Sequence, residues 1–155
     1  MLSRPLRVIA PSEYITEQAL TSSAAKLMPR GTTILAITGA TLGQVSMLEI
    51  ECAASQSVVG IVDPTCLRSA FVYLLMRERI PELVARATGG AQVHINKDIV
   101  NAFQVLLPAS SLLTLFKDHV DPMFRQIAVT LLANEKLRAA RDLLLPRLMS
   151  GEITV

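Results

Sequence analysis

The segment from Ala109 to Met149 most constrains what this chain can fold into, because it contains no glycine and repeats apolar residues at helical spacing. Residues three or four positions apart lie on one side of a helix, so the pattern predicts one long helix. Such a helix rises about 1.5 Å per residue and outreaches a small domain, so it must lie against another helix or another protein. The predicted interface stripe consists of Val120, Phe124, Ile127, Leu131, Asn134, Leu137, Arg141, Leu144 and Leu148.

Two polar residues, Asn134 and Arg141, interrupt this stripe. A polar residue on such a seam costs stability but fixes the register and the number of helices. We therefore expect a specific coiled-coil interface, formed most simply in a homodimer. The alternative, packing of the helix onto its own domain, accounts for the N-terminal part near Leu112, Leu113 and Phe116 but poorly for residues beyond Leu131. We also expect that the helix could be interrupted and restart at Asp121, as N-cap, with Pro122 in the first helical position.

Composition limits the class of protein. The chain has 155 residues, 51% apolar and 18% charged, which is enough to bury one core. A mean hydropathy of +0.44 is high for a soluble monomer, so we expect a partner to cover part of the apolar surface. The formal charge of +2 neither requires nor excludes nucleic acid.

The sequence predicts a cytoplasmic protein. Two uncharged runs, 31–48 and 99–116, contain glycine or proline and amide side chains, and neither has the composition of a membrane span. The first residues include too few apolar side chains for a signal peptide. Cys52 and Cys66 belong to no metal-binding spacing, so we expect buried small residues there instead of a disulfide or a metal site.

Residues before the long helix predict a small sheet. Residues 32–38 and 44–48 form a hairpin around a loop bracketed by Gly39 and Gly43, and residues 53–62 and 100–107 supply further strands. Residues 66–86 have helical spacing, with Pro81 as a point where the helix could break, and residues 13–25 form a short helix or an irregular connection. The predicted fold is therefore mixed α+β, with a sheet domain at 1–108, a coiled-coil-forming helix at 109–149 and a tail at 150–155.

No catalytic signature is present in the sequence. It contains no HExxH, no Gly-x-Ser-x-Gly and no phosphate-binding loop of the GxxxxGK[ST] type. We therefore expect a protein that is not an enzyme, with no catalytic residues.

Five segments carry a resemblance to a known family: TILAITGATLGQ at 33–44, ASQS at 54–57, ATGGAQVHIN at 87–96, VLLP at 105–108 and LLLPRLMSGE at 143–152. In this order and spacing they resemble the specificity subunit of type I restriction-modification enzymes. The resemblance extends from about Glu13 to the end of the chain. It implies a mixed α/β target recognition domain followed by a long helix that spaces it from a second such domain.

The resemblance also implies the partners. Specificity subunits recognise a DNA sequence and position it for methyltransferase subunits, which use S-adenosylmethionine, and for a restriction subunit, while binding no cofactor themselves. Compared with the family pattern, we expect this chain to hold one domain-plus-helix unit and to lack the first part of a recognition domain. We expect two copies to pair through their helices and compensate for this. The alternative is an oligomerising or adaptor fragment without DNA binding of its own.

The candidate DNA-binding residues follow from the resemblance and from the chemistry of two glycine loops. Glycine lets the backbone approach a phosphate closely, and glutamine can pair with N6 and N7 of adenine. The alternative is that both loops are ordinary turns. Lys26 and Arg86 are further candidates for phosphate contacts, although a solvated surface position explains each of them, and Lys97, better. The predicted set is Thr38, Thr41, Gln44, Thr88, Gly89, Gly90, Gln92 and Lys97.

Overall fold

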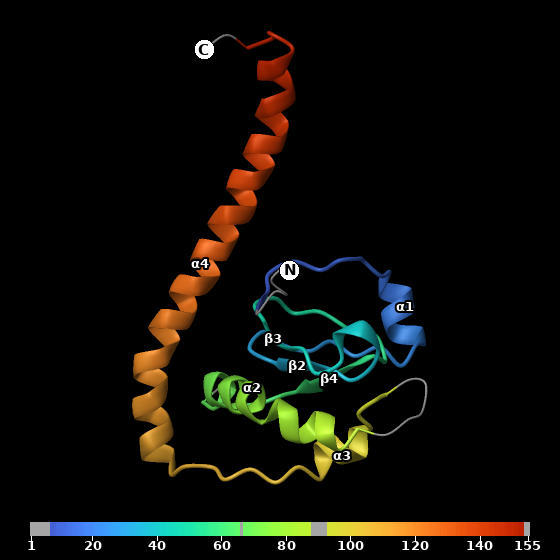
Figure 1. Ribbon diagram of the computed structural model, residues 1–155, viewed down its shortest axis with the longest axis vertical. Helices are drawn as coiled ribbons and strands as arrows, with labels where there is room; N and C mark the ends of the chain where they lie inside the picture. Colours follow the sequence, from blue (N-terminus) through green and yellow to red (C-terminus); the bar gives the residue numbers. More distant parts are fainter. Residues whose placement is uncertain (1–6, 66, 88–92, 154–155) are drawn as a thin grey trace.

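The predicted hairpin forms the centre of the sheet in the computed structural model, which describes residues 7–65, 67–87 and 93–153 (Figure 1). Strand β2, Thr33–Ala36, pairs antiparallel with β3, Val45–Leu48, so that Leu35 lies opposite Val45. The third predicted strand is confirmed as β4, Val58–Ile61, antiparallel to β2. A strand that the sequence did not predict, β1, Arg7–Val8, lies parallel to β3. The order β1-β3-β2-β4 makes the sheet mixed.

Helix α2, Ser69–Ala85, packs on one face of this sheet. Alternate residues of a strand point to the same side, which brings Leu35 and Ile37 together with Val45 and Met47. These apolar side chains meet one side of α2 and enclose Ile95 from a later segment. The buried core cluster consists of Leu35, Ile37, Val45, Met47, Tyr73, Met76, Leu83 and Ile95.

A tight turn closes the hairpin and presses it against α2. Gly43 has φ of +80°, and a Cβ added there would lie 3.1 Å from Cγ2 of Val84. We expect Gly43→Ala to lower the free energy of unfolding by about 2–3 kcal/mol, through backbone strain and overpacking together. Gly39→Ala is the matched control, because Gly39 has φ of +73° but open space around its Cβ, and it should cost only about 1 kcal/mol. Urea denaturation measures both; equal costs would show that contact with α2 is unimportant.

The predicted strand at 100–107 is wrong. Residues Lys97–Asn101 form the short helix α3, and residues 103–109 have no regular secondary structure. The physical reason lies at Asn96, whose side-chain oxygen accepts a hydrogen bond from the amide of Asp98 at 3.1 Å and starts a helix. Phe103 is half-buried against the core and under the guanidinium of Arg86, whereas Val105 and its neighbours are exposed.

Neither proline breaks its helix. Helix α2 continues through Pro81, and the long helix α4, Ser110–Met149, continues through Pro122, so the expected interruption there is wrong. Asp121 does not act as an N-cap; it forms an ion pair with Lys117, one turn earlier in the same helix. The missing amide of Pro122 leaves the carbonyl of Asp118 without its helical donor, and that exposed residue can bond water instead.

The remaining short helix resolves an alternative that the sequence left open. Residues 13–25 contain the helix α1, Glu17–Ser22, which begins where the Thr16 hydroxyl accepts from the Ala19 amide at 3.1 Å. Together, the four-stranded sheet, its helices and α4 confirm the predicted mixed α+β class. No helix in the described ranges has the length and apolar composition needed to cross a membrane.

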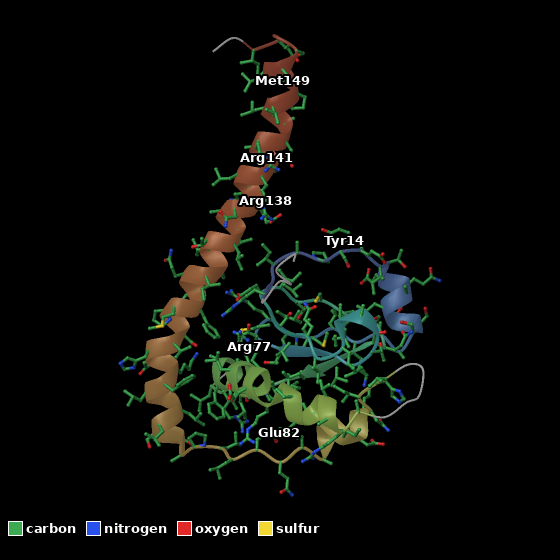
Figure 2. The ribbon with its side chains drawn as sticks, in the orientation of Figure 1. Tyr14, Arg77, Glu82, Arg138, Arg141 and Met149 are labelled. Atoms are coloured by element: carbon green, nitrogen blue, oxygen red, sulfur yellow. The ribbon has the colours of Figure 1, made fainter. Side chains whose placement is uncertain are left out.

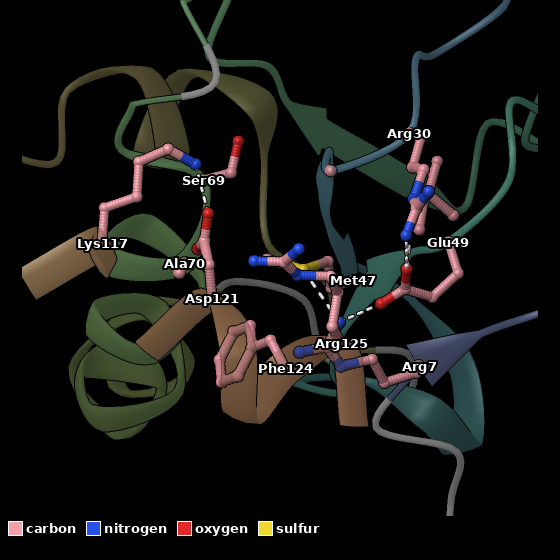
Figure 3. Close-up of a pocket in the computed structure, with 12 residues that line it drawn as sticks. Arg7, Arg30, Met47, Glu49, Ser69, Ala70, Lys117, Asp121, Phe124 and Arg125 are labelled. Carbon is pink, nitrogen blue, oxygen red and sulfur yellow. Dashed lines mark hydrogen bonds and ion pairs between the residues drawn. The ribbon is translucent and has the colours of Figure 1, made fainter. Parts of the chain in front are cut away.

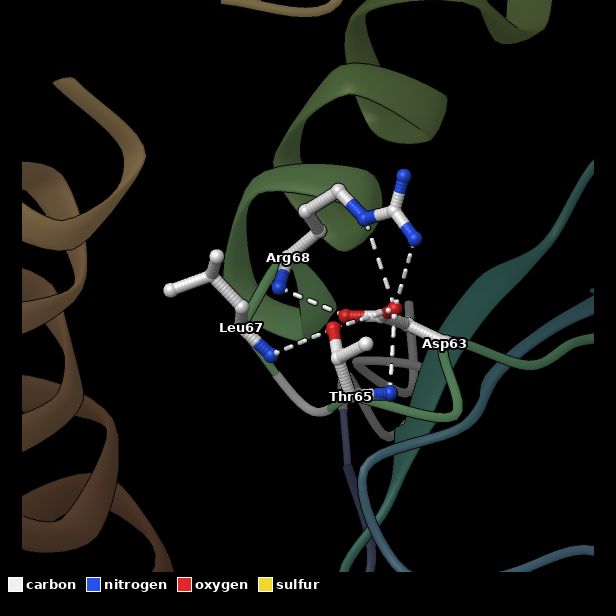
Figure 4. Close-up of polar contacts among 4 residues, drawn as sticks. All are labelled: Asp63, Thr65, Leu67 and Arg68. Carbon is white, nitrogen blue, oxygen red and sulfur yellow. Dashed lines mark hydrogen bonds and ion pairs between the residues drawn. The ribbon is translucent and has the colours of Figure 1, made fainter. Parts of the chain in front are cut away.

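A buried carboxylate joins β4 to α2 (Figure 4). Asp63 accepts hydrogen bonds from the Arg68 amide at 2.6 Å, the Arg68 guanidinium at 3.0 Å and the Thr65 hydroxyl at 2.9 Å. Burial alone would raise the pKa of this carboxyl, but the hydrogen bonds to its charged form outweigh burial and hold the pKa below its ordinary value. Asp63 thereby fixes the turn from which α2 begins.

The first half of α4 packs beside α2, and the second half extends past the sheet domain (Figure 1). Phe116 meets Phe71 edge-on at 6.0 Å between ring centroids, and Phe124 meets Tyr73 in the same way at 5.8 Å. The guanidinium of Arg7, from β1, lies 4.0 Å from the centroid of the Phe124 ring. From residue 132 to residue 149 every side chain is exposed. Figure 2 shows Arg138, Arg141 and Met149 on this free part.

Candidate nucleic-acid interface

The hairpin loop that carries Thr38, Thr41 and Gln44 lies on the side of the sheet away from α4 (Figure 1). Residues Gly39–Thr41 form a single 3-10 turn, η1, and the Gly43 amide donates to the Ala36 carbonyl at 2.9 Å. Thr41 is exposed and Thr38 half-buried. The half-buried Gln44 directs its amide along β3 toward the Ser46 hydroxyl, at 3.5 Å. Of the three, Thr41 is therefore the side chain most accessible to a ligand.

The second glycine loop lies outside the described residues, and with it Thr88, Gly89, Gly90 and Gln92. The chain that follows is anchored beside the first loop, because the amide of the fully buried Ile95 donates to the Ile37 carbonyl at 2.9 Å. On the other side, the Ile37 amide donates to the Ser57 carbonyl at 2.9 Å. Three segments distant in sequence thus meet around Ile37, next to Thr38.

Lys97 lies at this meeting point and shares a cavity with Lys26. Lys97 is the exposed first residue of α3, and Lys26 is exposed on the connection after α1. Neither lysine forms an ion pair with another described residue. The cavity has a volume of about 680 Å³, and no acidic side chain is among its described lining residues. These are Ser23, Ala24, Ala25, Lys26, Met28, Ala54, Ser55, Gln56, Val58, Val59, Gly60 and Lys97.

The chemistry of this surface suits an anionic chain. Two unpaired ammonium groups can contact phosphates, and the hydroxyls of Ser23 and Ser55 can donate to phosphate oxygens. β4, which borders the cavity, lies at one edge of the described sheet. No spacing or motif in the sequence links Lys26 to Lys97, and only the folded chain brings them to one cavity. Arg86 differs from them, because its guanidinium stacks over Phe103 at 5.5 Å.

Other chemistry has little support in the described residues. No group of three His, Cys, Asp or Glu side chains there is arranged to hold a metal ion. Cys52 is a free cysteine, and burial raises the pKa of its thiol. It is half-buried, whereas Cys66 lies outside the described residues.

The predicted helix stripe divides between two surfaces. Val120, Phe124 and Leu131 are half-buried on the part of α4 that passes the sheet domain, with Phe124 packed against the core. The exposed members of the stripe begin at Ile127 and continue as Asn134, Leu137, Arg141, Leu144 and Leu148.

Two further exposed residues, Met123 and Thr130, extend the exposed stripe, although the sequence pattern did not include them. Met123 is 63% exposed, and it precedes Ile127 and Thr130 at steps of four and three. These side chains border an apolar hollow of about 620 Å³, lined by Pro122, Met123, Gln126, Ile127, Thr130 and Leu131. An uninterrupted alternation of four- and three-residue steps, the spacing of a coiled-coil seam, thus runs along the exposed side of α4. This seam consists of Met123, Ile127, Thr130, Asn134, Leu137, Arg141, Leu144 and Leu148.

Comparison with known proteins gives relatives of one kind. The type I restriction enzyme HindI specificity subunit of Haemophilus influenzae is 29% identical over 117 residues, which cover 74% of this chain and 26% of that protein. The MjaIX specificity subunit of Methanocaldococcus jannaschii is 28% identical over 156 residues, covering 95% of this chain and 35% of the relative. The EcoDI specificity subunit of Escherichia coli is 26% identical over 98 residues, covering 61% and 22%.

These relatives are much longer than the chain, which spans about a quarter to a third of the first two. No family model matches the sequence. All three relatives are nevertheless specificity subunits of type I restriction enzymes, the family that the sequence segments resemble. Over most of its length, the chain is a distant homologue of the specificity subunits of type I restriction enzymes.

Proposed function

We propose that this chain is part of a DNA-sequence recognition subunit of a type I restriction-modification complex, acting in the cytoplasm. Distant homology to specificity subunits over 74% and 95% of the chain carries the proposal. Specificity subunits are non-catalytic. The chain would position DNA for a methyltransferase subunit and a restriction subunit. It would bind no cofactor itself, and the methyltransferase would use S-adenosylmethionine.

The surface around Ile37 is the part of the domain best suited to DNA. Thr41 would approach base edges from the hairpin loop, while Lys26 and Lys97 would contact the backbone. Phosphate contacts of this kind fix position and orientation, whereas contacts to base edges give specificity. The lysine-lined cavity, without acidic side chains in its described lining, supports this assignment.

The test is DNA affinity as a function of salt. We expect Lys97→Ala and Lys26→Ala each to weaken binding about three- to tenfold and to reduce the slope of log affinity against log salt by about one, because each removes one phosphate contact. Fluorescence anisotropy with a duplex of the cognate system measures both quantities. Lys136→Ala, at an exposed position on α4, is the matched control. The same slope in all four proteins would contradict the assignment.

The exposed seam of α4 supports a homodimer. A parallel pair in register would bring the two Arg141 side chains together on the seam, and like charges repel there. In one antiparallel register, by contrast, all eight seam positions find a counterpart on the second copy and each Arg141 meets a threonine. The pairs in this register are Met123 with Leu148, Ile127 with Leu144, Thr130 with Arg141, and Asn134 with Leu137.

The second candidate function is an adaptor that assembles through α4 without binding DNA. The exposed apolar residues of the seam and the small net charge favour it. It predicts the same dimer but no salt-dependent affinity for any duplex. Binding of the neighbouring methyltransferase subunit in the absence of DNA binding would select this function over the first.

A further inference from the structure

A second cavity lies at the opposite end of the hairpin, between the sheet and α4 (Figure 3). Its volume is about 400 Å³. Lys117, Asp121, Phe124 and Arg125 border it from α4, Ser69 and Ala70 from the start of α2, and the remaining residues come from β1, from β3 and its end, and from the segment before β2. The lining consists of Arg7, Arg30, Gly31, Met47, Leu48, Glu49, Ser69, Ala70, Lys117, Asp121, Phe124 and Arg125.

Positive charge exceeds negative charge in this cavity. Two carboxylates face four cationic side chains, and both carboxylates are already engaged: Glu49 by Arg7 and by Arg30, and Asp121 by Lys117. Arg125 is exposed and forms no ion pair within the described part of the chain. The cavity therefore retains a net positive charge that its own carboxylates do not neutralise.

One of the cations is buried and incompletely bonded. The Arg7 side chain is 3% exposed, and its Nη1 donates to Glu49 and to Sδ of Met47. Its Nη2 is buried without a hydrogen-bond partner among the described residues, and the central carbon of the same guanidinium lies over the ring of Phe124. A buried donor left unpaired destabilises the fold, and such a group is often satisfied by a bound ion or water. Arg7, which lines the cavity, thus retains a donor that an anionic oxygen bound there could satisfy.

The N-terminal end of α2 adds an electrostatic field that favours an anion. The first helical hydrogen bond is donated by Val72 to the Arg68 carbonyl at 2.7 Å, so the amides of Ser69 and Ala70 have no acceptor within the helix. The Asp63 carboxylate binds the amide of Arg68 just before the helix, but no acidic residue occupies the first turn itself, and both Ser69 and Ala70 line the cavity. Amides and dipole together make a helix N-terminus of this kind favourable for an anion.

We propose that this cavity binds a phosphate group, held by Arg125, Lys117, the Ser69 hydroxyl and the start of α2, above the buried Arg7. Phosphate carries enough negative charge to neutralise the excess and accepts several hydrogen bonds at once. It comes either from inorganic phosphate or from a DNA backbone. The site does not depend on the proposed function, because its location, its residues and its binding of inorganic phosphate are separate from the surface around Ile37.

The first experiment titrates inorganic phosphate into the full chain by calorimetry, at constant ionic strength maintained with chloride. We expect saturable binding that Arg125→Ala weakens about tenfold, since one charge-assisted contact is lost, and that Lys136→Ala leaves unchanged. Arg125 is exposed and unpaired, so its substitution should leave the circular dichroism spectrum and the melting temperature intact. Absence of phosphate binding, or equal affinity in wild type and Arg125→Ala, would overturn the proposal.

The second experiment identifies the source of the phosphate. If inorganic phosphate displaces a labelled duplex and Arg125→Ala weakens duplex binding, the cavity takes a backbone phosphate. If Arg125→Ala loses phosphate binding but retains duplex affinity, the ligand is free phosphate. Phosphate binding by a chain that binds no duplex would contradict the proposed DNA recognition while supporting the cavity.

Discussion

Leu144→Asp is expected to convert the proposed homodimer into a monomer, raising its dissociation constant at least about 100-fold. Leu144 is 44% exposed in the single chain, and in the antiparallel register it meets Ile127 of the second copy. Burying a carboxylate against that side chain is costly because no cation in the seam lies opposite it. Light scattering behind size-exclusion chromatography, over a range of concentrations, measures the change.

Leu143→Asp is the matched control for this substitution. Leu143 is adjacent, 67% exposed, and about 100° away from Leu144 around the helix axis, off the seam. The Leu143→Asp protein should therefore still form the proposed dimer. Neither substitution touches the chain's own core, so both proteins should keep the wild-type circular dichroism spectrum. A Leu144→Asp protein that elutes and scatters as a dimer would contradict the seam, and monomers from both variants would place the interface on a broader surface of α4.

The second large effect is expected at Asp63. Asp63→Ala should lower the free energy of unfolding at pH 7 by about 2–3 kcal/mol, because several charge-assisted hydrogen bonds are lost and the Arg68 amide loses its acceptor. Asp63→Asn should cost less, since its amide oxygen can still accept from that amide. Denaturant unfolding of the three proteins measures the difference. Asp142→Ala, which removes an exposed ion pair with Arg141, should cost about 0–1 kcal/mol as a surface control.

The pH dependence of this effect has a definite sign. The pKa of Asp63 is lower in the folded chain than in the unfolded chain, so the unfolded chain binds the proton more readily. Its contribution to stability is present above the unfolded pKa of about 4 and is lost as the pH falls through the folded value. Wild type should therefore lose its advantage over Asp63→Ala in acid. A difference between the two that stays constant from pH 7 to pH 3 would show that the carboxylate charge is not the cause.

Local pattern was enough to predict the centre of the sheet. The run of β-branched residues from Thr32 and the glycines at 39 and 43 determine a hairpin, because each favours one local conformation. The two-residue strand β1 carries no such signal, since its parallel pairing with β3 depends on a distant part of the chain. At 100–107 the alternating pattern was misleading, because the helix that Asn96 caps includes Val100 and Asn101, and residues 103–109 have no regular secondary structure.

The candidate sites were only partly visible for a similar reason. Thr41 and Lys97 could be named from their loops, but the cavity that Lys97 shares with Lys26 is created by tertiary contacts around Ile37. On α4, helical spacing alone cannot separate a stripe that faces the chain's own core from one that faces outward. Phe124 and Ile127 fit the same pattern, and only the packing of Tyr73 against Phe124 shows which side is occupied.

The contact between Phe124 and Arg7 lies near the point where α4 leaves the sheet domain, so a small tilt at this contact moves the far end of the helix by a larger distance. The connection at 103–109 has no regular structure, so the contacts between α4 and the sheet domain set the angle at which the helix leaves. The part beyond residue 131 is roughly 27 Å long at 1.5 Å per residue, and a tilt of about 10° would displace its tip by roughly 5 Å. That displacement exceeds the spacing of one base pair, about 3.4 Å along the axis of a duplex. The stiffness of the contact between Phe124 and Arg7 would therefore determine how precisely the helix could hold two domains at a fixed separation on DNA.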